Sequence, residues 1–266
     1  MATQTVVFIS GVSRGIGRTL AETYLSKPNH TVIGSTRSGN NDELKALSAA
    51  NGSNIILVKI ESATLSDPGE AIKELTAAGI DHVDVVIANA GVSPAILPPA
   101  TANLEDAAQA FTVNTLGPWS LFQALLPLLE KSQNAKWVGI TSAVASLGAM
   151  EAFGAHVAPA YGISKVGLNW LTLAVHCQYK WLTAFVLHPG RSLVQTEMGN
   201  KAAQMMGMEK APDTKEKSAE SIIGMVSTFS IMLACEDAHK QKVENATKES
   251  TSGKMFNAID GAAIPW

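Results

Sequence analysis

Near its start the chain reads TVVFISGVSRGIG, from Thr5 to Gly17. Thr5–Ser10 is apolar and rich in β-branched residues, which predicts a buried strand. Glycines follow in the spacing G-x-x-x-G-x-G, and a helix is predicted after them over Ile16–Ser26. Glycines between a strand and a helix let the backbone turn tightly and approach a phosphate at the helix N-terminus. The stretch therefore predicts either a dinucleotide-binding β-α unit or a glycine-rich turn that binds no ligand.

The same turn contains the pattern G-x-S-x-G, which marks the nucleophile elbow of α/β-hydrolases. Its position argues against a hydrolase. Ser13 follows the first strand, so no upstream strand and loop can supply an oxyanion hole. None of the histidines lies in a sequence context typical of a catalytic triad. They are His30, His82, His156, His176, His188 and His239.

Strands and helices continue to alternate along the chain. Apolar strands separated by helices at this spacing predict a parallel sheet covered by helices on both faces. Further strands are predicted at residues 30–37, 54–60, 83–91, 136–142, 181–190 and 254–259, and helices at Asp42–Ala50, Pro68–Ala78, about Leu104–Glu130 and the stretch containing Tyr161. No repeat or linker divides the chain, so we expect one α/β domain of about seven strands over residues 1–266.

The composition is that of an ordinary enzyme, with 46% hydrophobic residues, 16% charged residues and a net charge of −3. No basic patch indicates nucleic acid or a membrane surface. No apolar run approaches the roughly 18 residues of a membrane span, and Met1–Gln4 lacks the features of a signal peptide. Cys177 and Cys235 have no metal or redox spacing. We therefore expect a cytoplasmic protein without a metal site, whose cysteines are reduced core residues.

The stretch Tyr161-Gly162-Ile163-Ser164-Lys165 places a phenol and an ammonium four residues apart, on one face of a predicted helix. A cation about 4 Å away contributes about 4 kcal/mol at an effective dielectric of 20. That energy would bring the phenol pKa towards neutrality, where acid–base catalysis works best. The alternative is an aromatic core residue followed by a chance lysine.

Taken together, these motifs resemble those of the short-chain dehydrogenase/reductase family, in the same order. The resemblance covers about Thr5 to Trp266, and the stretches DVVIANAGVS, YGISKVGLNWLT and LHPG are most similar to a fungal branch that includes norsolorinic-acid ketoreductase and relatives of bacterial C-factor. It implies a single-domain Rossmann-type, doubly wound parallel sheet. The matching motifs are Gly11–Gly17, Ala88-Asn89-Ala90-Gly91, Asn114, Ser142, Tyr161 with Lys165, and Pro189-Gly190.

The resemblance implies four catalytic residues. In the family a tyrosine, here Tyr161, gives its proton to the carbonyl oxygen while the nicotinamide delivers a hydride to the carbon. Lys165 lowers the phenol pKa and bonds the nicotinamide ribose. Ser142 holds the substrate oxygen, and Asn114 anchors a proton-relay water. Without Tyr161 and Lys165 in the same chain, Ser142 would be interpreted as a polar residue at the end of a strand. Asn114 would likewise be interpreted as a buried amide that hydrogen-bonds the backbone.

The resemblance also implies the cofactor contacts. Asn89 lines the adenosine-ribose side and stabilises the sheet, while Val194 and Thr196 hold the nicotinamide carboxamide. Glu61 stands where an aspartate commonly meets the adenine amine. The segment from residue 189 to 196 is about two residues longer than the family pattern. The expected cofactor-binding residues are Gly11, Ser13, Arg14, Gly15, Ile16, Gly17, Arg37, Glu61, Asn89, Tyr161, Lys165, Pro189, Gly190, Val194 and Thr196.

The end of the second strand indicates which dinucleotide is bound. NAD-dependent enzymes place an acidic residue there to hold the ribose 2′-hydroxyl. Here the strand ends with Arg37, and no carboxylate follows until Asp42. A guanidinium would bind a 2′-phosphate, and Arg14 can approach it from the glycine turn. The residues predict NADPH, unless both arginines merely face solvent.

Three apolar segments are expected to bound the substrate pocket, namely Ser93–Leu97, Leu147–Phe153 and the methionine-rich Gln195–Pro212. The insert Met150–Pro159 is expected to form one wall. Gln195–Pro212 is either a substrate lid with Gly199 and Gly207 as hinges, or a helical insert that packs on the core.

We therefore expect an NADPH-dependent reductase of a ketone or aldehyde, with a pocket suited to a bulky aromatic or polyketide-like ketone. The alternative is a non-enzymatic NADP(H)-binding regulator on the same fold. The family resemblance also implies a homo-oligomer, either a dimer or a tetramer.

Overall fold

One sheet of eight strands forms the centre of the computed structural model, which describes residues 4–227, 249 and 251–266. The order across the sheet is β3-β2-β1-β4-β5-β6-β7-β8, and the pairs are parallel except for β7 with β8. Each predicted strand contains an observed one, so the doubly wound parallel sheet is confirmed. The strands are β1 (Thr5–Ser10), β2 (His30–Thr36), β3 (Asn54–Lys59), β4 (Val85–Ala88), β5 (Lys136–Ile140), β6 (Thr183–His188), β7 (Met255–Asn257) and β8 (Ala263–Ile264).

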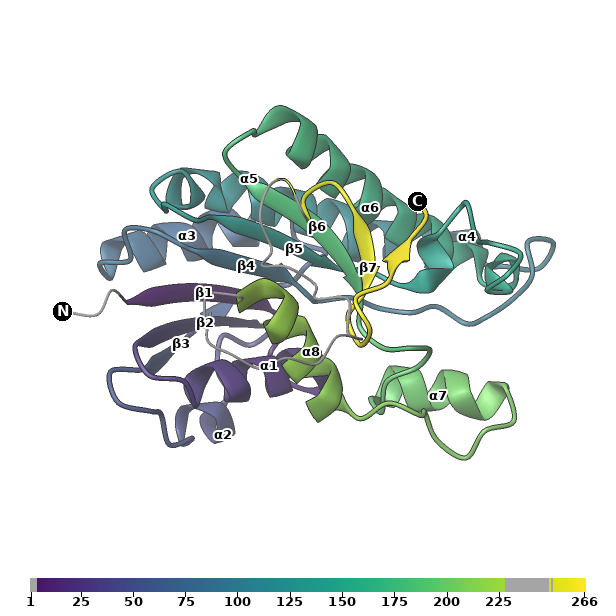
Figure 1. The fold of residues 1–266 in the computed structure, drawn as a ribbon, viewed down its shortest axis with the longest axis horizontal. Coiled ribbons are helices and arrows are strands. Elements are labelled where there is room, and N and C mark those ends of the chain that lie inside the picture. The colour runs from purple at the N-terminus through teal and green to yellow at the C-terminus, as the bar shows by residue number, and fades with distance from the viewer. Residues whose placement is uncertain (1–3, 228–248, 250) are drawn as a thin grey trace, which may run out of the picture.

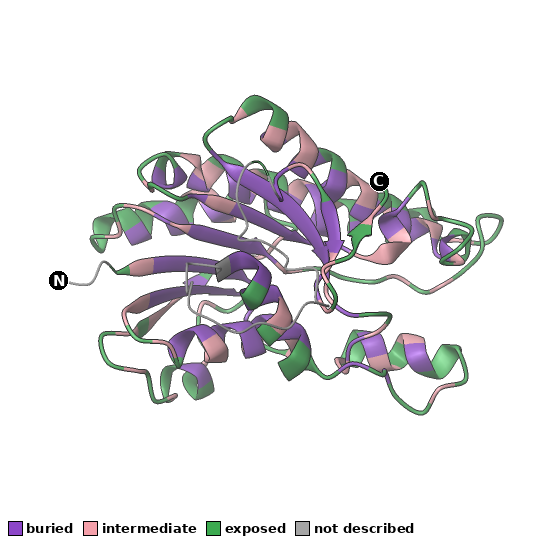
Figure 2. Ribbon diagram, in the orientation of Figure 1, coloured by how far each residue is buried: buried purple, intermediate pink, exposed green. Residues whose placement is uncertain are grey.

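Helices cover both faces of the sheet (Figure 1). Leu20 of α1 and Ile222 of α8 pack in the core on one face, and Leu125 of α5 and Leu171 of α6 in the core on the other. Most residues of the central strands are buried, because helices cover both faces, and these strands are accordingly rich in apolar residues (Figure 2). No helix in the described ranges is long and apolar enough to cross a membrane. The helices are α1 (Gly15–Leu25), α2 (Asp42–Lys45), α3 (Asp67–Ala77), α4 (Leu104–Phe111), α5 (Gly117–Leu129), α6 (Pro159–Gln178), α7 (Glu197–Met205) and α8 (Lys215–Ser227).

The helix predicted over Asp42–Ala50 is too long, because α2 ends at Lys45. The backbone N–H of Ala50 donates to the carbonyl of Leu25 at the end of α1, at 3.0 Å. The chain then turns through Gly52, whose φ is 75°, and enters β3. This contact with α1 takes the residues after α2 out of helical geometry.

The structure adds one short strand, β8, to the about seven that the sequence predicts. With two residues, β8 is too short to show a periodic pattern. Asp260-Gly261 lies in the turn before it, and Gly261 has a φ of 69°. An Asp-Gly pair is a hairpin signal, and it could have revealed this strand.

The prediction that both cysteines are core residues is wrong for Cys177, which is exposed. Cys177 lies seven residues after Trp170 on α6, which is also exposed. Residues seven apart share a helical face, so Cys177 faces away from the sheet. Cys235 lies outside the described residues, as does His239.

Candidate active site

A cleft of about 690 Å³ opens at the carboxyl ends of the strands, beside the point where the strand order reverses between β1 and β4. Ligands bind at this place in open α/β sheets. Among the described residues, the predicted Gly17, Asn114, Ser142, Gly190 and Val194 do not line the cleft. The predicted residues that do line it are Gly11, Ser13, Arg14, Gly15, Ile16, Arg37, Glu61, Asn89, Tyr161, Lys165, Pro189 and Thr196.

The glycine turn brings the N-terminus of α1 against the ends of β1 and β4. A Cβ atom at Gly17 would lie 2.2 Å from the Gly11 oxygen and 2.4 Å from Asn89 Nδ2, so only glycine fits. Asn89 Nδ2 donates to the carbonyls of Ser10 (2.9 Å) and Gly11 (3.2 Å). No side chain caps α1, whose N-cap residue is Arg14. Its first N–H groups are therefore available to an anion such as a pyrophosphate.

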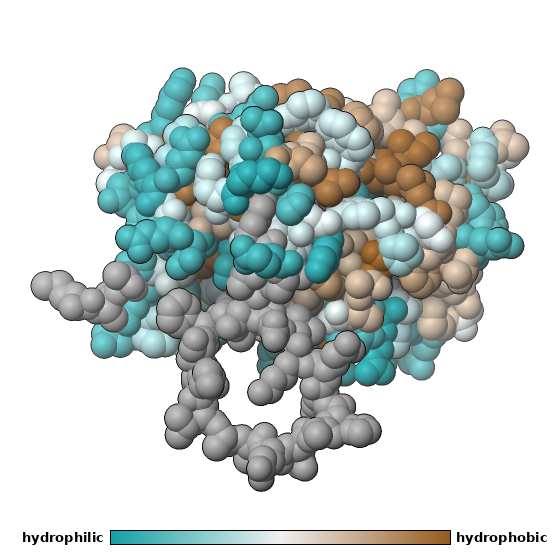
Figure 3. All heavy atoms as spheres, turned by 45° about the horizontal axis from the view of Figure 1, so that its top comes forward, coloured by the Kyte–Doolittle hydropathy of each residue, from teal (hydrophilic) through white to brown (hydrophobic). Residues whose placement is uncertain are grey.

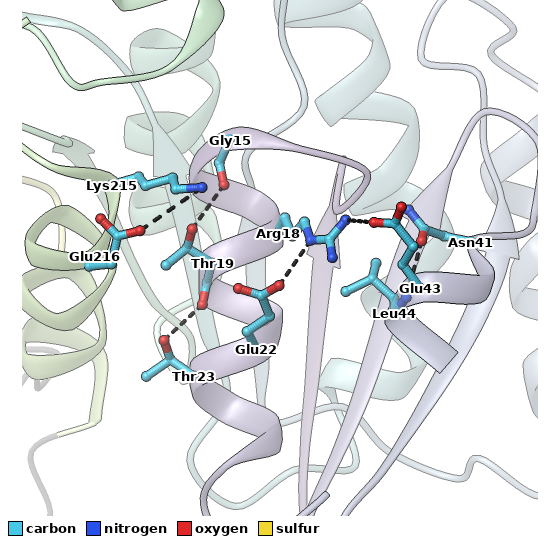
Figure 4. A network of polar contacts seen from close by, with 10 residues as sticks. All are labelled: Gly15, Arg18, Thr19, Glu22, Thr23, Asn41, Glu43, Leu44, Lys215 and Glu216. Atoms are coloured by element: carbon cyan, nitrogen blue, oxygen red, sulfur yellow. Dashed lines mark hydrogen bonds and ion pairs between the residues drawn. The ribbon is translucent and has the colours of Figure 1, made fainter. Parts of the chain in front are cut away.

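Arg18, on the first turns of α1, is occupied by two carboxylates. Its Nε donates to Glu22 at 2.9 Å, and its Nη1 donates to Glu43 of α2 at 2.6 Å. Figure 4 shows this guanidinium between the two helices. Arg18 therefore joins α2 to α1 and is not free to bind a ligand.

Arg14 and Arg37 are the cationic residues that the sequence assigns to a 2′-phosphate, and both line the cleft. Arg14 pairs with Glu197 at the start of α7, and the two side chains are 74% and 75% exposed. Exposed ion pairs contribute about 0–1 kcal/mol, so this pair can open at little cost. The Arg37 guanidinium has no hydrogen-bond or ion-pair partner among the described residues. Both arginines are therefore available to an anionic ligand.

Tyr161 and Lys165 lie one turn apart on α6, as predicted. Lys165 Nζ is 6.0 Å from the centre of the Tyr161 ring and donates to the carbonyl of Ile140 at 2.8 Å. Ser142, which follows β5, hydrogen-bonds the Tyr161 side chain. The residues after β5 and the first two turns of α6 thus bring a phenol, a hydroxyl and an ammonium together, and the phenol and the ammonium line the cleft.

Burial dominates the electrostatics of this cluster. It raises the pKa of Tyr161 to about 12, although the hydrogen bond with Ser142 acts in the opposite direction. Burial lowers the pKa of Lys165 to about 8. The net shift of the Tyr161 pKa is therefore upward, opposite to the direction expected from a nearby cation, and the role assigned to Lys165 remains a prediction. Desolvation of the phenol is the larger cause of this shift, and burial also disfavours the charged form of Lys165.

Asn114 lies in a π-helical turn, Thr112–Leu116, which interrupts the single long helix predicted here. Asn114 Oδ1 accepts from the N–H of Val92, and Nδ2 donates to the Val92 carbonyl, both at 2.8 Å. Nδ2 also donates to Ser164 Oγ at 2.9 Å. Residue 118, four further along, is a proline and cannot donate to the carbonyl of Asn114. The side chain holds the loop after β4, and the backbone carbonyl receives no α-helical hydrogen bond from residue 118.

Ser164, beside Lys165, was not predicted as a site residue. Its hydroxyl is fully buried and donates to the carbonyl of Tyr161 at 2.7 Å, while it accepts from Asn114. Ser164 itself does not line the cleft. Several residues that do line it were also not predicted, because they come from elements brought to the cleft by long-range packing, and no local signal identifies them. They include Gln109, Val113 and Lys215.

The predicted apolar boundary is only partly present in this cleft. Gln195–Pro212 contributes lining residues, including Met198. Ser93–Leu97 and Leu147–Phe153 do not line the cleft among the described residues, although both carry exposed apolar side chains. The wall expected from Met150–Pro159 remains a prediction.

The methionine-rich segment forms α7 and a turn at Gly207, whose φ is 78°. Its two ends are joined, because the N–H of Gln195 donates to the carbonyl of Asp213 at 2.8 Å. A Cβ at Gly199 would lie 2.0 Å from the carbonyl oxygen of Val194. Close packing therefore explains Gly199, and the hinge assigned to it has no support.

Known proteins match nearly the whole chain. The family model for short chain dehydrogenase matches residues 5–207. A short-chain dehydrogenase of Neurospora crassa is 43% identical, over 98% of this chain and 98% of that protein. The norsolorinic acid ketoreductase of Aspergillus parasiticus is 36% identical, over 99% of this chain and 92% of that protein. An NADPH-bound carbonyl reductase from chicken fatty liver has the same fold, with a TM-score of 0.80 at 22% identity over 100% of this chain and 96% of that one.

Proposed function

Because the chain belongs to the short-chain dehydrogenase family, we propose that it is an NADPH-dependent oxidoreductase that reduces a ketone or an aldehyde. The predicted fungal branch, which contains norsolorinic acid ketoreductases, is confirmed by the sequence matches. The observation that carries the proposal is the cluster of Tyr161, Ser142 and Lys165 beside the glycine turn. In this proposal Tyr161 is the proton donor, Ser142 binds the substrate oxygen and Lys165 is the cation. All three lie near the glycine turn proposed to bind the dinucleotide.

In the proposed complex, the N-terminus of α1 would bind the pyrophosphate, and Arg14 and Arg37 the 2′-phosphate. Glu61 would meet the adenine. Bound NADPH supplies the hydride for the carbonyl carbon. The nicotinamide end of the cofactor is assigned to four residues after β6, namely Pro189, Gly190, Val194 and Thr196. Of these, Pro189 and Thr196 line the cleft.

The catalytic residues would act on the carbonyl oxygen and its proton. Because the pKa of Tyr161 is about 12, its phenol is protonated at neutral pH, as reduction requires. Ser142 would hold the substrate oxygen beside that phenol. Lys165 would stabilise the phenolate left after proton transfer. We assign the relay water to the backbone carbonyl of Asn114, because its side-chain amide is already bonded to neighbouring residues.

The ionisation of Lys165 predicts that the rate of reduction falls at high pH. The pKa of Lys165 is lowered to about 8, so the cation is lost as pH rises through that value. We expect kcat/KM for ketone reduction to fall about tenfold per pH unit above pH 8, because kcat/KM reports the ionisations of the free enzyme. Lys165→Arg should be slower, but its fall in rate should move to higher pH. A wild-type profile that is flat up to about pH 10 would contradict this role.

The substrate is proposed to be a bulky aromatic or polyketide-like ketone. The likeness to a protein named norsolorinic acid ketoreductase supports this, as do exposed apolar side chains on the segments proposed as pocket walls, such as Leu97, Leu147 and Phe153. The test is NADPH consumption over a series of ketones of increasing ring number, with NADH in parallel. Turnover should increase with ring number.

The alternative, an NADP(H)-binding regulator, predicts cofactor binding without turnover of any ketone or aldehyde in that series. The presence of all four family catalytic residues disfavours it, because a sensor requires no proton donor.

We propose that residues 195–212 close over the bound substrate and exclude water. Lys201 and Lys210 of this segment are exposed, so trypsin should cut there in the free protein. Addition of NADP⁺ with a product alcohol should slow this cleavage at least about fivefold, in the manner of ligand-stabilised closed states. Equal cleavage in both states would identify the segment as ordinary packing.

The proposed homo-oligomer has support from exposed apolar side chains on α4, α5 and α6, namely Leu104, Phe111, Trp119, Ile163 and Trp170. Figure 3 shows hydrophobic residues gathered on the right of the view, the side on which α4 lies in Figure 1. The oligomeric state and the cytoplasmic location both remain predictions.

A further inference from the structure

The last residues of the sequence follow a route determined by the sheet. β8 pairs antiparallel with β7, with Met255 opposite Ile264 and Phe256 opposite Ala263. β7 in turn pairs with β6. Pro265 and Trp266 therefore leave the edge of the sheet in a defined direction, which Figure 1 shows at the yellow end of the ribbon near α6.

Pro265 and Trp266 bind the loop that follows Ser142. Ser146 Oγ donates to the Pro265 carbonyl at 2.6 Å, and the N–H of Gly148 donates to Trp266 O at 2.7 Å. Ser146 is fully buried and also accepts from the N–H of Ala149 at 3.1 Å. A buried hydroxyl that loses its partner is costly, so these contacts hold the loop in one place.

Gly148 shows how closely the two segments approach. A Cβ atom there would lie 3.1 Å from Pro265 Cβ and 3.2 Å from Trp266 O. These contacts are tighter than ordinary van der Waals distances. Gly148 does not have a positive φ, so alanine would be acceptable to its backbone and would disturb only the contact with Pro265 and Trp266.

The same loop supports the catalytic cluster. A short 3-10 helix, Ala143–Ala145, begins directly after Ser142. Val144 lies 3.5 Å from the position of a Cβ at Gly162, which follows Tyr161 on α6. The loop therefore lies between Pro265–Trp266 on one side and the helical turn that carries the phenol on the other.

We propose that Pro265 and Trp266 are positioning residues for Ser142. By holding Ser146 and Gly148, they keep the Ser142 hydroxyl against Tyr161 and against the substrate oxygen. The catalytic consequence rests on the proposed function, whereas the effect on the loop does not. The substrate carbonyl, and not the dinucleotide, is the ligand that should respond.

Two variants test the proposal: removal of residues 265–266, and Gly148→Ala, which keeps the chain length. In both, we expect kcat/KM for the best ketone to fall at least about tenfold, about 1.4 kcal/mol, while the KM for NADPH changes less than about twofold. Trp266→Ala should be nearly neutral, since its backbone oxygen remains. Gly69→Ala on α3 is the matched control, because nothing lies within 4 Å of the added methyl.

Amide hydrogen exchange of residues 143–149 provides a readout that needs no substrate. Exchange there should become at least about tenfold faster in both variants and stay unchanged in Gly69→Ala. Unchanged exchange of residues 143–149 in Gly148→Ala would overturn the proposal that Pro265 and Trp266 hold this loop. Faster exchange with unchanged ketone kinetics would overturn the proposal that they position Ser142. A wild-type chain that reduces no ketone would contradict the proposed function. The exchange result would still show whether Pro265 and Trp266 hold residues 143–149. If the shortened chain does not fold, Gly148→Ala decides the matter.

Discussion

Tyr161→Phe is expected to lower kcat for ketone reduction by about 1000-fold, within the range that a general acid contributes. The phenol bonds Ser142, its ring centre lies 6.0 Å from Lys165 Nζ, and the substitution removes only its hydroxyl. The ring remains packed at the cleft, so the dissociation constant for NADPH should change less than about threefold. Steady-state kinetics and a fluorescence titration with NADPH measure the two quantities.

The matched control for that variant is Tyr179→Phe. Tyr179 is the C-cap of the same helix, and its ring packs against Phe122 away from the cleft. Its rate should stay close to wild type. If Tyr161→Phe keeps more than about a tenth of the wild-type rate, the loss is below about 1.4 kcal/mol, and the proton-donor role is wrong.

Features encoded by neighbouring residues could be predicted from the sequence. Strands buried on both faces are continuous apolar runs, and this pattern located seven of them. The glycine turn lies between a strand and a helix, so its place at the carboxyl edge of the sheet follows from the alternation. Tyr161 and Lys165 share a helical face because they are four residues apart.

Features that depend on distant contacts could not be predicted in this way. The side chain of Asn114 is bonded to Val92 and Ser164, 22 and 50 residues away. α2 is shortened by a bond to α1, and the loop after Ser142 is held by the last two residues. The direction of the phenol pKa depends on how much water the fold removes, and local spacing does not reveal this.

Arg37 makes the cofactor preference testable. It lies directly after β2 at the edge of the cleft, exposed and without an ion-pair partner among the described residues. The nearest following carboxylate, Asp42, begins α2 and accepts from Asn40 Nδ2 at 2.9 Å. No acidic group therefore follows β2 directly to repel a 2′-phosphate or to hold a ribose 2′-hydroxyl.

Arg37→Asp is expected to lower kcat/KM for NADPH by at least about 100-fold, about 2.7 kcal/mol, because a charge-assisted bond is lost and a repulsive carboxylate is gained. The value for NADH should change less than about threefold, or rise, because the new carboxylate can accept from the ribose 2′-hydroxyl. Lys73→Asp on α3 makes the same change in net charge at an exposed position outside the cleft, and it should leave both values near wild type. A wild-type enzyme that uses both cofactors with similar kcat/KM would refute the NADPH assignment. An equal loss of kcat/KM with both cofactors in Arg37→Asp would show that Arg37 supports the fold of the cleft and does not bind the 2′-phosphate.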